Sequence, residues 1–394
     1  MPSANAAPRR FYIDNLRNIA VLLLIVFHTA RLFDAESWHM KDVASYQLAG
    51  VVIDVINQWH MPLFFLLTGM AAFLAVPRRG AGGFVRERVF RLFIPLLFGI
   101  LVAVLPQVYL ERISPYVPNR QSPVDFTGGF FDFVPQFFTS VYPEGNFSYH
   151  HLWFIWYLFL YSLLLAPLFA VLSRPRVMER VAKAGAWFAG GWRILLLGLP
   201  VTVAEGLLRA EFPSTHATID DWANHAHFLL VILVGWLVAS APALVERAAQ
   251  IRWIALGLGA ATTLITLPAP EWMLLPAPAG WYVTGFIYFA GEWLWLVAFL
   301  GFGVRLLNRR VPYLTAFTRY AFPFYIAHQA VIVFLGWLTF DWQSAPFLKY
   351  LAIAVLAAAI SYIIVRLLDL TAPTRFLIGL RSPRQVPLGE RAPA

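Results

Sequence analysis

Apolar segments long enough to cross a membrane recur along almost the whole chain, and they constrain the fold more than any other feature. A helix needs about 20 apolar residues to span a bilayer core of roughly 30 Å. Only 13% of the 394 residues are charged, about half the share in a soluble domain. We therefore predict an all-α, polytopic integral membrane bundle of about ten transmembrane helices. The predicted spans are 12–33, 47–74, 89–110, 151–172, 190–208, 223–241, 252–268, 281–304, 318–338 and 347–368.

The basic residues are distributed unevenly between the two sides of these spans. With the N-terminus placed inside, 24 of the 30 Lys and Arg residues fall on or next to the internal side. Such an excess follows the positive-inside rule and predicts that both termini are cytoplasmic. The net charge of +9 is then a consequence of topology, and we expect no nucleic-acid partner. The six external residues are Arg31, Lys41, Arg112, Arg120, Arg209 and Lys349.

The domain organisation follows from the same pattern. We predict one membrane domain over residues 1–372 and a disordered, Pro- and Arg-rich cytoplasmic tail over 373–394. The external connection 111–150 is long and rich in aromatic residues, so we expect it to carry a partly amphipathic helix at the membrane surface. The chain has no cysteine, which excludes disulfides and thiolate chemistry.

The first span carries three ionisable residues, Asp14, Arg17 and His28. Ionisable groups inside a membrane are costly and suggest a functional site. Eleven residues separate Arg17 from His28, which is three helical turns plus about 20°, so the two side chains share a face about 16 Å apart. An imidazole in the outer half of the span can take a proton from a hydroxyl or carry an acyl group. The alternatives are a structural buried histidine and a simple Asp14–Arg17 ion pair.

A second group of arginines lies at the cytoplasmic start of the third span. Arg88 and Arg91 are three residues apart, so they share one helical face. Together with Arg17 they would suit a polyanion such as a nucleotide, because a guanidinium group binds phosphate well. Generic positive charges flanking a span are the alternative.

Several further polar residues are candidates for lining the site. Asn57 and His60 are three apart and are predicted to share a face of the second span. His151 lies at the outer start of the fourth span and His328 within the ninth. Glu292, in the middle of the eighth span, needs a partner, for which a histidine such as His328 is one choice. For each of them a structural hydrogen bond or packing role is the alternative.

Two more histidines, His225 and His227, follow a pair of aspartates. Their spacing does not place both on one face of a helix, and no other metal-binding motif accompanies them. We therefore expect no metal site.

Five blocks, in this order along the chain, resemble the membrane acyltransferase-3 family. Singly they are short, but together they cover essentially the whole predicted membrane portion, and within the family they are similar to a branch that modifies glucans. They are Arg17-x10-His28, NQWHMPLFFLLTG (57–69), Arg88-x-x-Arg91 followed by a proline in the third span, HLWFIWYLFLYS (151–162) and FPFYIAHQAVIV (322–333).

The resemblance implies a membrane O-acyltransferase of the bacterial inner membrane. It implies an acyl-CoA donor from the cytoplasm, an acetyl or succinyl group, and a hydroxyl acceptor on an extracytoplasmic glycan, with membrane lipid around the bundle. By resemblance His28 is catalytic, while Arg17, Arg88 and Arg91 bind the donor. A proton-coupled transporter of a small polar or glycan-related substrate is the alternative, and a non-catalytic scaffold for glycan assembly is a third reading.

Overall fold

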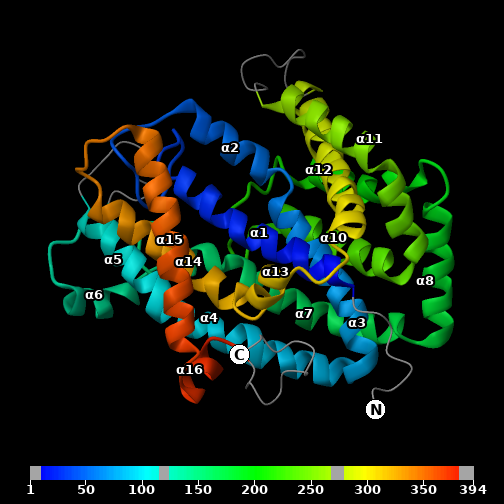
Figure 1. Cartoon of the computed structure of the whole chain (residues 1–394), viewed down its shortest axis with the longest axis horizontal. Helices are drawn as coiled ribbons and strands as arrows, with labels where there is room; N and C mark the ends of the chain where they lie inside the picture. The colour runs from blue at the N-terminus through cyan, green and yellow to red at the C-terminus, as the bar shows by residue number, and fades with distance from the viewer. Residues whose placement is uncertain (1–9, 115–123, 268–278, 381–394) are drawn as a thin grey trace.

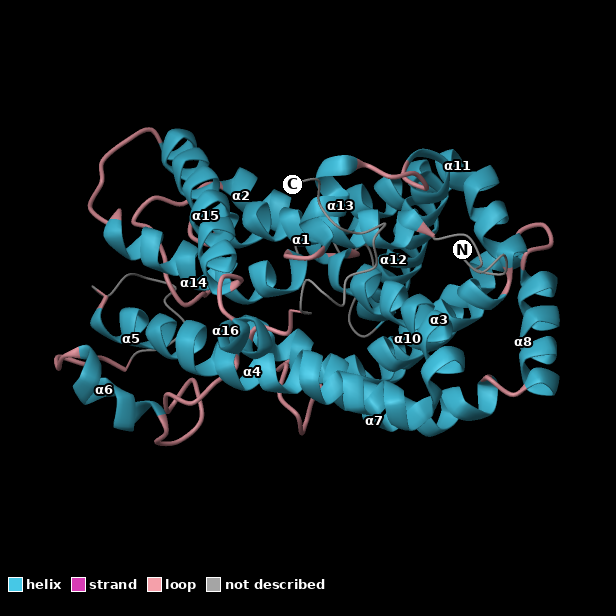
Figure 2. Cartoon of the chain, turned by 60° about the horizontal axis from the view of Figure 1, so that its bottom comes forward, coloured by secondary structure: helices cyan, strands magenta, loops and turns pink. Residues whose placement is uncertain are grey.

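A computed structural model describes residues 10–114, 124–267 and 279–380. Within these ranges the chain forms helices and no strand, which confirms the predicted all-α class (Figures 1 and 2). The elements are α1 (Phe11–Ala30), α2 (Gln47–Asn57), α3 (His60–Arg88), η1 (Val89–Phe93), α4 (Ile94–Gly99), η2 (Ile100–Val104), α5 (Leu105–Ile113), α6 (Phe130–Phe137), η3 (His150–Leu152), α7 (Trp153–Leu172), α8 (Pro175–Phe188), η4 (Arg193–Gly198), α9 (Leu199–Leu208), α10 (Trp222–Ser240), α11 (Pro242–Thr266), α12 (Ala279–Leu306), α13 (Pro312–Thr318), α14 (Ala321–Leu338), α15 (Pro346–Leu368) and α16 (Ala372–Leu377).

The described residues contain eight helical runs long and apolar enough to cross a membrane, or nine if one bent pair counts as a span. One run, Gln47–Ile113, is 67 residues long, about 100 Å if fully helical, and it includes two of the predicted spans. Gly80 has φ 70° and interrupts it between those two spans. The short predicted span 190–208 is divided into η4 and α9, and it passes as a span only together with α8, from which it bends by 119°.

Helix α1 runs through the middle of the bundle. In both views α14 and α15 lie on one side of it and α10, α11 and α12 on the other (Figures 1 and 2). It packs against α2, α3, α12, α13, α14 and α15. Two buried amides hold its first half, since Asn15 donates to the carbonyl of Leu307 (2.7 Å) and Asn18 to that of Leu314 (2.7 Å). The helix that carries both Arg17 and His28 is therefore fixed on several sides.

Helices α3 and α10 approach each other closely because glycines occupy the crossing. A Cβ on Gly69 would lie 1.9 Å from the carbonyl oxygen of Ile232, and one on Gly235 would lie 2.2 Å from that of Leu66. Small residues at such crossings let two backbones meet, which is a common means of packing helices in a membrane.

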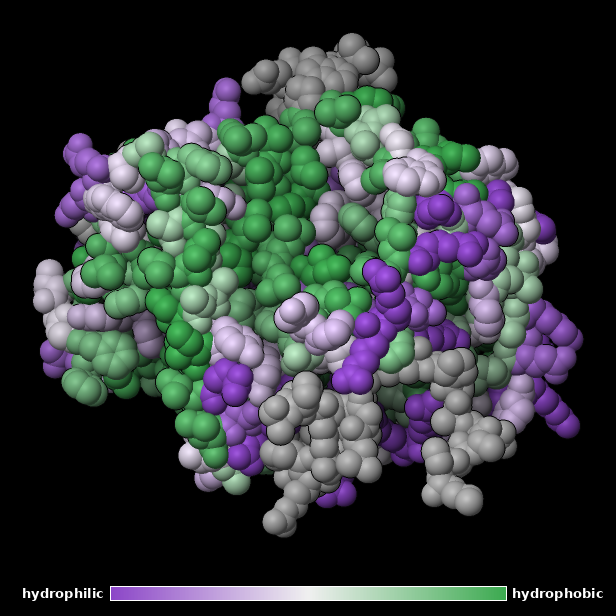
Figure 3. Space-filling view, viewed as in Figure 1, coloured by the Kyte–Doolittle hydropathy of each residue, from purple (hydrophilic) through white to green (hydrophobic). Residues whose placement is uncertain are grey.

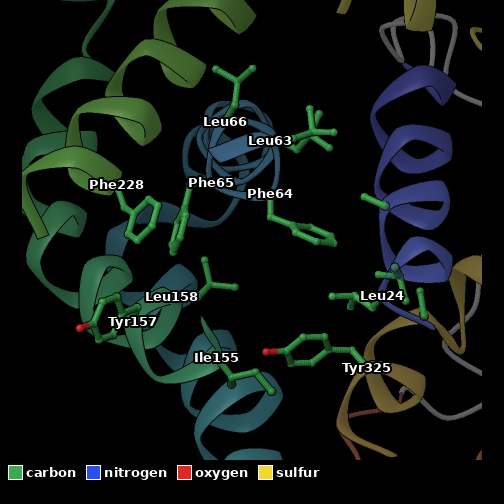
Figure 4. Close-up of a cluster of buried hydrophobic side chains, with 14 of the residues drawn as sticks. Leu24, Leu63, Phe64, Phe65, Leu66, Ile155, Tyr157, Leu158, Phe228 and Tyr325 are labelled. Carbon is green, nitrogen blue, oxygen red and sulfur yellow. The ribbon is translucent and has the colours of Figure 1, made fainter. Parts of the chain in front are cut away.

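The buried core packs α3, α7, α10 and α14 together around the C-terminal half of α1. Figure 4 shows Leu24 of α1, Phe64 of α3 and Tyr325 of α14 converging, with Tyr325 reaching toward α7. Phe65 stacks on Phe228 at 4.3 Å, which ties α3 to α10. The core therefore meets the face of α1 that also carries the candidate catalytic residue.

The outer surface suits a lipid environment. Apolar side chains cover α15 and the middle of the viewed face, while hydrophilic ones gather toward its edges (Figure 3). Lipid replaces water as the solvent for such a surface, so exposed leucines and valines there carry no penalty. The exposed apolar residues of α15 include Leu348, Leu351, Val355, Leu356, Ile363 and Leu367.

The structure adds detail to two predicted segments, the external connection 111–150 and the C-terminal tail. The long external connection contains α6, whose Phe133 and Phe137 are buried while Phe131 is 86% exposed, so the short helix is amphipathic as expected. The tail predicted as disordered from residue 373 begins instead with α16, and the residues after 380 lie outside the described ranges. Gly379, with φ 70°, lies close to Pro95 and Arg91, since a Cβ at this position would come within 3.0 Å of the proline ring and 3.3 Å of the Arg91 carbonyl oxygen.

Candidate active site

Three histidines from separate parts of the chain meet at the C-terminal end of α1. His28 lies in the last turn of α1, His151 in η3 and His328 in the middle of α14. The ring centroids lie 5.0 Å apart for His28 and His328, 6.5 Å for His28 and His151, and 5.4 Å for His151 and His328. We call these three residues the histidine cluster. The structure thus brings together three of the residues selected from the sequence.

In His151 and His328 one ring nitrogen bonds a backbone carbonyl and the other is unused. His328 donates from Nδ1 to the carbonyl of Tyr325 (2.6 Å), and His151 donates from Nε2 to the carbonyl of Ile326 (3.1 Å). Among the described residues, His328 Nε2, His151 Nδ1 and His28 Nδ1 are buried without a hydrogen-bond partner. Buried polar atoms normally have partners, so unpaired ones require an explanation. Rings that are neutral with one N–H committed keep a lone pair for a substrate proton.

Packing holds the cluster in place. Tyr325 donates its hydroxyl hydrogen to the carbonyl of His151, which ties η3 to α14. The indole of Trp38 stacks on the His28 ring at 6.0 Å, and Phe27 meets it edge-on at 5.1 Å. His60 borders this region by stacking on Phe27 at 6.4 Å, but its Nε2 bonds the carbonyl of Ala20 (2.8 Å). His60 is therefore a wall of the site with one nitrogen already committed.

The loop that supplies Trp38 is braced by a buried charge pair. Lys41 donates from Nζ to the carbonyl of Arg31 (2.7 Å) and to Asp34, which also accepts from Arg31 (2.5 Å). Burial raises the pKa of Asp34 and lowers the pKa of Lys41, so forming the pair offsets a desolvation cost in both groups. The loop can thus hold its tryptophan against His28.

The arginines identified from the sequence also gather, nearer the N-terminal end of α1. Arg88 lies within electrostatic range of Arg17, Arg79 and Arg91, with Glu87 as the nearby acid. Its guanidinium lies 4.6 Å from the ring centroid of Phe84, and its buried Nε has no hydrogen-bond partner among the described residues. We call Arg17, Arg88 and Arg91 the arginine cluster. Like charges held together in this way favour an anion.

The acidic residues near the arginine cluster pair with it only weakly. Asp14 lies 3.4 Å from Arg17, and both side chains are partly exposed. Glu87 lies 3.6 Å from Arg91 and also pairs with Arg79. Exposed pairs of this kind contribute about 0–1 kcal/mol, so an anionic ligand could displace them. Asp14 and Arg17 thus form the ion pair that the sequence allowed as the alternative to a role in the site.

Asn57 does not join the site. It is exposed at the end of α2, and α3 starts at His60, so the two residues do not share a helical face as predicted. Trp59, with φ −132° and ψ −14°, separates the helices. The buried amide is the next residue, Gln58, which accepts from Thr263 (2.5 Å) and donates to the carbonyl of Tyr288 (3.0 Å).

Glu292 belongs to a different group of charges. It is buried and bonds Nε2 of His227 (3.0 Å), and Nδ1 of His227 bonds Glu205 (2.7 Å). Arg209 donates twice to Glu205 at 2.8 Å. The suggested pairing of Glu292 with His328 is therefore wrong, because a histidine on α10 lies closer. We call Glu205, Arg209, His227 and Glu292 the buried ion network.

Sequence reasoning missed one cluster near the site. His39, Glu111 and His150 are all buried, and their ligand atoms lie within 4.8 Å of one another. They come from a loop, the end of α5 and η3, which are distant in sequence. The WH and HH pairs that contain Trp38–His39 and His150–His151 were the available signal. The separation of the two pairs along the chain gave no reason to place them side by side.

Comparison with known proteins agrees with the residue pattern. A family model described as an acyltransferase domain matches residues 10–366. The chain is 23% identical over 345 residues to glucans biosynthesis protein C of Salmonella schwarzengrund (strain CVM19633) and to that of Salmonella typhi, and each alignment covers 85% of both chains. No solved structure matches the chain. Because the family model spans nearly the whole length, the chain belongs to the acyltransferase-3 family of membrane acyltransferases.

Proposed function

We propose that the protein transfers an acyl group, acetyl or succinyl, from cytoplasmic acyl-CoA to a hydroxyl of a glycan outside the bacterial inner membrane. One observation carries this proposal: α1 has the arginine cluster toward its N-terminal end and the histidine cluster at its C-terminal end. Arg17 and His28 share a face about 16 Å apart, which suits a donor whose phosphates and reactive thioester lie far apart.

In the proposed reaction His28 acts as the base. Its unpaired nitrogen accepts the proton of the acceptor hydroxyl as that oxygen attacks the thioester carbonyl. The C–S bond breaks and the acyl group stays on the acceptor oxygen. The His28 imidazolium then gives its proton to the departing thiolate, so that CoA leaves as the thiol and His28 is neutral again. His151 and His328, with one free nitrogen each, orient the acceptor hydroxyl. Arg17, Arg88 and Arg91 hold the donor phosphates.

The relatives' name supports the acceptor class. They are called glucans biosynthesis protein C, and glucans present many hydroxyls. The proposal also places the bundle in membrane lipid. The excess of basic residues on the internal side follows from membrane topology, so the proposal includes no nucleic-acid partner.

The direct test compares envelope glycans from cells with the wild-type protein, His28→Ala or neither, by mass spectrometry. A mass increment that requires the wild type identifies both the transfer and the acyl group. An increment that persists with His28→Ala would remove His28 from the mechanism. If no sample shows it, the glycan acceptor is wrong.

Transport remains the only competing activity with a structural observation behind it, the buried ion network, since intramembrane Glu and His side chains can relay protons. Membership of an acyltransferase family favours the enzyme. Proton-driven uptake of a glycan-related substrate by proteoliposomes without acyl-CoA would support the transporter instead.

A further inference from the structure

We propose that His39, Glu111 and His150 form a binding site for one divalent transition-metal ion of the zinc class. The three side chains, which we call the outer cluster, are buried, and their ligand atoms lie within 4.8 Å of one another. Two imidazoles and one carboxylate are a set of ligands typical of zinc, with a fourth position left open. This differs from the sequence-based expectation of no metal, which was drawn from the spacing of His225 and His227 and the lack of a metal-binding motif beside them.

The first argument is the free nitrogen of His150. Its Nδ1 and its backbone N–H both lie 2.9 Å from Oγ of Ser148. A ring that donates from Nδ1 presents the lone pair of Nε2, and this atom is buried without a hydrogen-bond partner among the described residues. A histidine that binds a metal usually has its other nitrogen fixed in this way.

The second argument is how the other two ligands are held. Glu111 is fully buried and accepts from the hydroxyl of Tyr142 at Oε1 (2.9 Å), while its Oε2 lies 3.6 Å from Nδ1 of His39. Tetrahedral ligands on zinc lie about 3.4 Å apart given bonds of about 2.0–2.1 Å. His39 and Glu111 are thus near the required separation already, and His150 has to turn out of its stack on the His39 ring to bring Nε2 to the same ion.

The third argument is backbone strain at His150. Its φ is 39°, a left-handed conformation that costs a residue other than glycine on the order of 1 kcal/mol. This conformation stacks its ring on His39 with centroids 4.0 Å apart. Strain of this sort persists where the surroundings hold it, and here it serves to bring the second imidazole to the carboxylate.

Arg112 lies against the outer cluster, with Nη1 3.7 Å from Glu111. Its other nitrogens donate to Asn146 (2.8 Å) and to the carbonyl of Gly145 (2.6 Å). The guanidinium therefore has its own anchors and leaves Oε2 of Glu111 on the side of His39. A dication on that side binds the carboxylate more strongly than a guanidinium 3.7 Å from the other oxygen does.

The place of the outer cluster suggests what the ion does. His39 follows Trp38, which stacks on His28, and His150 precedes His151, whose ring lies 6.5 Å from His28. One ion would therefore link the loop that places Trp38 against His28 to the turn that contributes His151 to the histidine cluster. We infer that it fixes the outer wall of the acceptor side rather than entering the acyl transfer itself.

The test uses the full-length protein in detergent, purified through a tag without histidine and stripped with EDTA. Zinc is added and counted by mass spectrometry, and cobalt(II) is added to record its visible absorption, which reports bound nitrogen and oxygen ligands. We expect one ion per chain. His150→Asn, which tolerates a positive φ, and Glu111→Gln should each lower affinity at least tenfold.

His225→Gln serves as the matched control, because His225 is a buried histidine bonded to Tyr161 (2.8 Å) and to the carbonyl of Thr218 (3.1 Å), apart from the outer cluster. It should bind zinc as the wild type does. If a variant fails to fold, the wild-type melting temperature decides, since an ion that binds only the folded state must raise it. Less than stoichiometric zinc with no rise in melting temperature overturns the site, whatever the outcome of the acyl-transfer assay.

Discussion

The histidine cluster and the buried ion network use similar side chains in opposite ways. In the network His227 has both ring nitrogens bonded to carboxylates, and Glu205 is also held by Arg209. In the histidine cluster every ring keeps one buried nitrogen without a partner among the described residues. A histidine with both ring nitrogens bonded stabilises one arrangement, whereas histidines with an unpaired buried nitrogen are costly and indicate a site kept open for a ligand. The two regions should therefore respond differently to substitution.

The sharpest test of this comparison is His28→Ala. We expect acyl transfer to fall by at least about 10², the lower end of what a general base contributes, while insertion and thermal stability change little. The measurement is transfer of labelled acyl groups, alongside a melting curve in detergent. A variant that melts far below the wild type would show that His28 is structural.

The network should give the reverse result. Glu292→Ala leaves His227 without one of its two carboxylates, and breaking a buried pair costs about 3–5 kcal/mol. We expect a large loss of thermal stability. Glu292→Gln, which keeps an acceptor of the same shape, is the milder control. Full stability in Glu292→Ala combined with lost transfer would place the network in the catalytic machinery and remove the contrast.

A smaller effect is expected in the arginine cluster. Arg17→Ala and Arg88→Ala should each weaken acyl-CoA binding about tenfold, because a charge-assisted hydrogen bond contributes about 1.5–3 kcal/mol. The difference from the wild type should narrow at high salt. Arg305→Ala, on an exposed residue paired with Glu246, is the control. If Arg17→Ala and Arg88→Ala bind acyl-CoA as tightly as the Arg305→Ala control and the wild type do, these arginines do not form the donor site.

His328→Asn tests whether the free nitrogens of the histidine cluster matter. The amide can still donate to the carbonyl of Tyr325 but lacks the Nε2 position. We expect a severalfold loss of transfer with stability unchanged, because the residue orients the acceptor rather than removing its proton. A lower melting temperature with normal transfer would assign His328 to packing.

The smallest effect concerns His216, in the loop between α9 and α10, whose pKa is lowered to about 4 by burial. Its unfolded pKa is about 6.5, so between pH 4 and 6.5 the unfolded chain binds more protons and stability rises with pH. Lowering the pH from 7 to 5 should reduce the free energy of unfolding by on the order of 1 kcal/mol. His216→Asn, compatible with the positive φ of 55°, should flatten this dependence in melting curves.

The sequence was sufficient for the class of fold and for much of the site. Apolar segments reveal a membrane bundle because each span must meet the lipid by itself, and the Arg17–His28 spacing holds because α1 is one continuous helix. The division after Asn57 was not predicted, because the polar residues Asn57 and His60 are spaced for one face of a continuous span. The 67-residue run, by contrast, was divided correctly, because the basic residues between 74 and 89 separate two apolar segments on either side of Gly80.

Contacts between distant segments were the harder part. His227, not His328, reaches Glu292, and nothing in the spacing distinguishes one buried histidine from another. The outer cluster combines a loop, a helix end and a helical turn, whose meeting depends on how the loops fold back. Ionisable residues could thus be identified from the sequence, but their partners depend on tertiary packing.

The crossing of α3 and α10 has a mechanical consequence. With Gly69 and Gly235 set against each other's helix backbones, neither helix can slide by a residue without driving a side chain into a carbonyl. The crossing therefore locks α3 against α10, and we expect the two parts of the bundle that contain these helices to move as one rigid body. Any opening that admits a bulky acceptor then has to come from segments outside this joint.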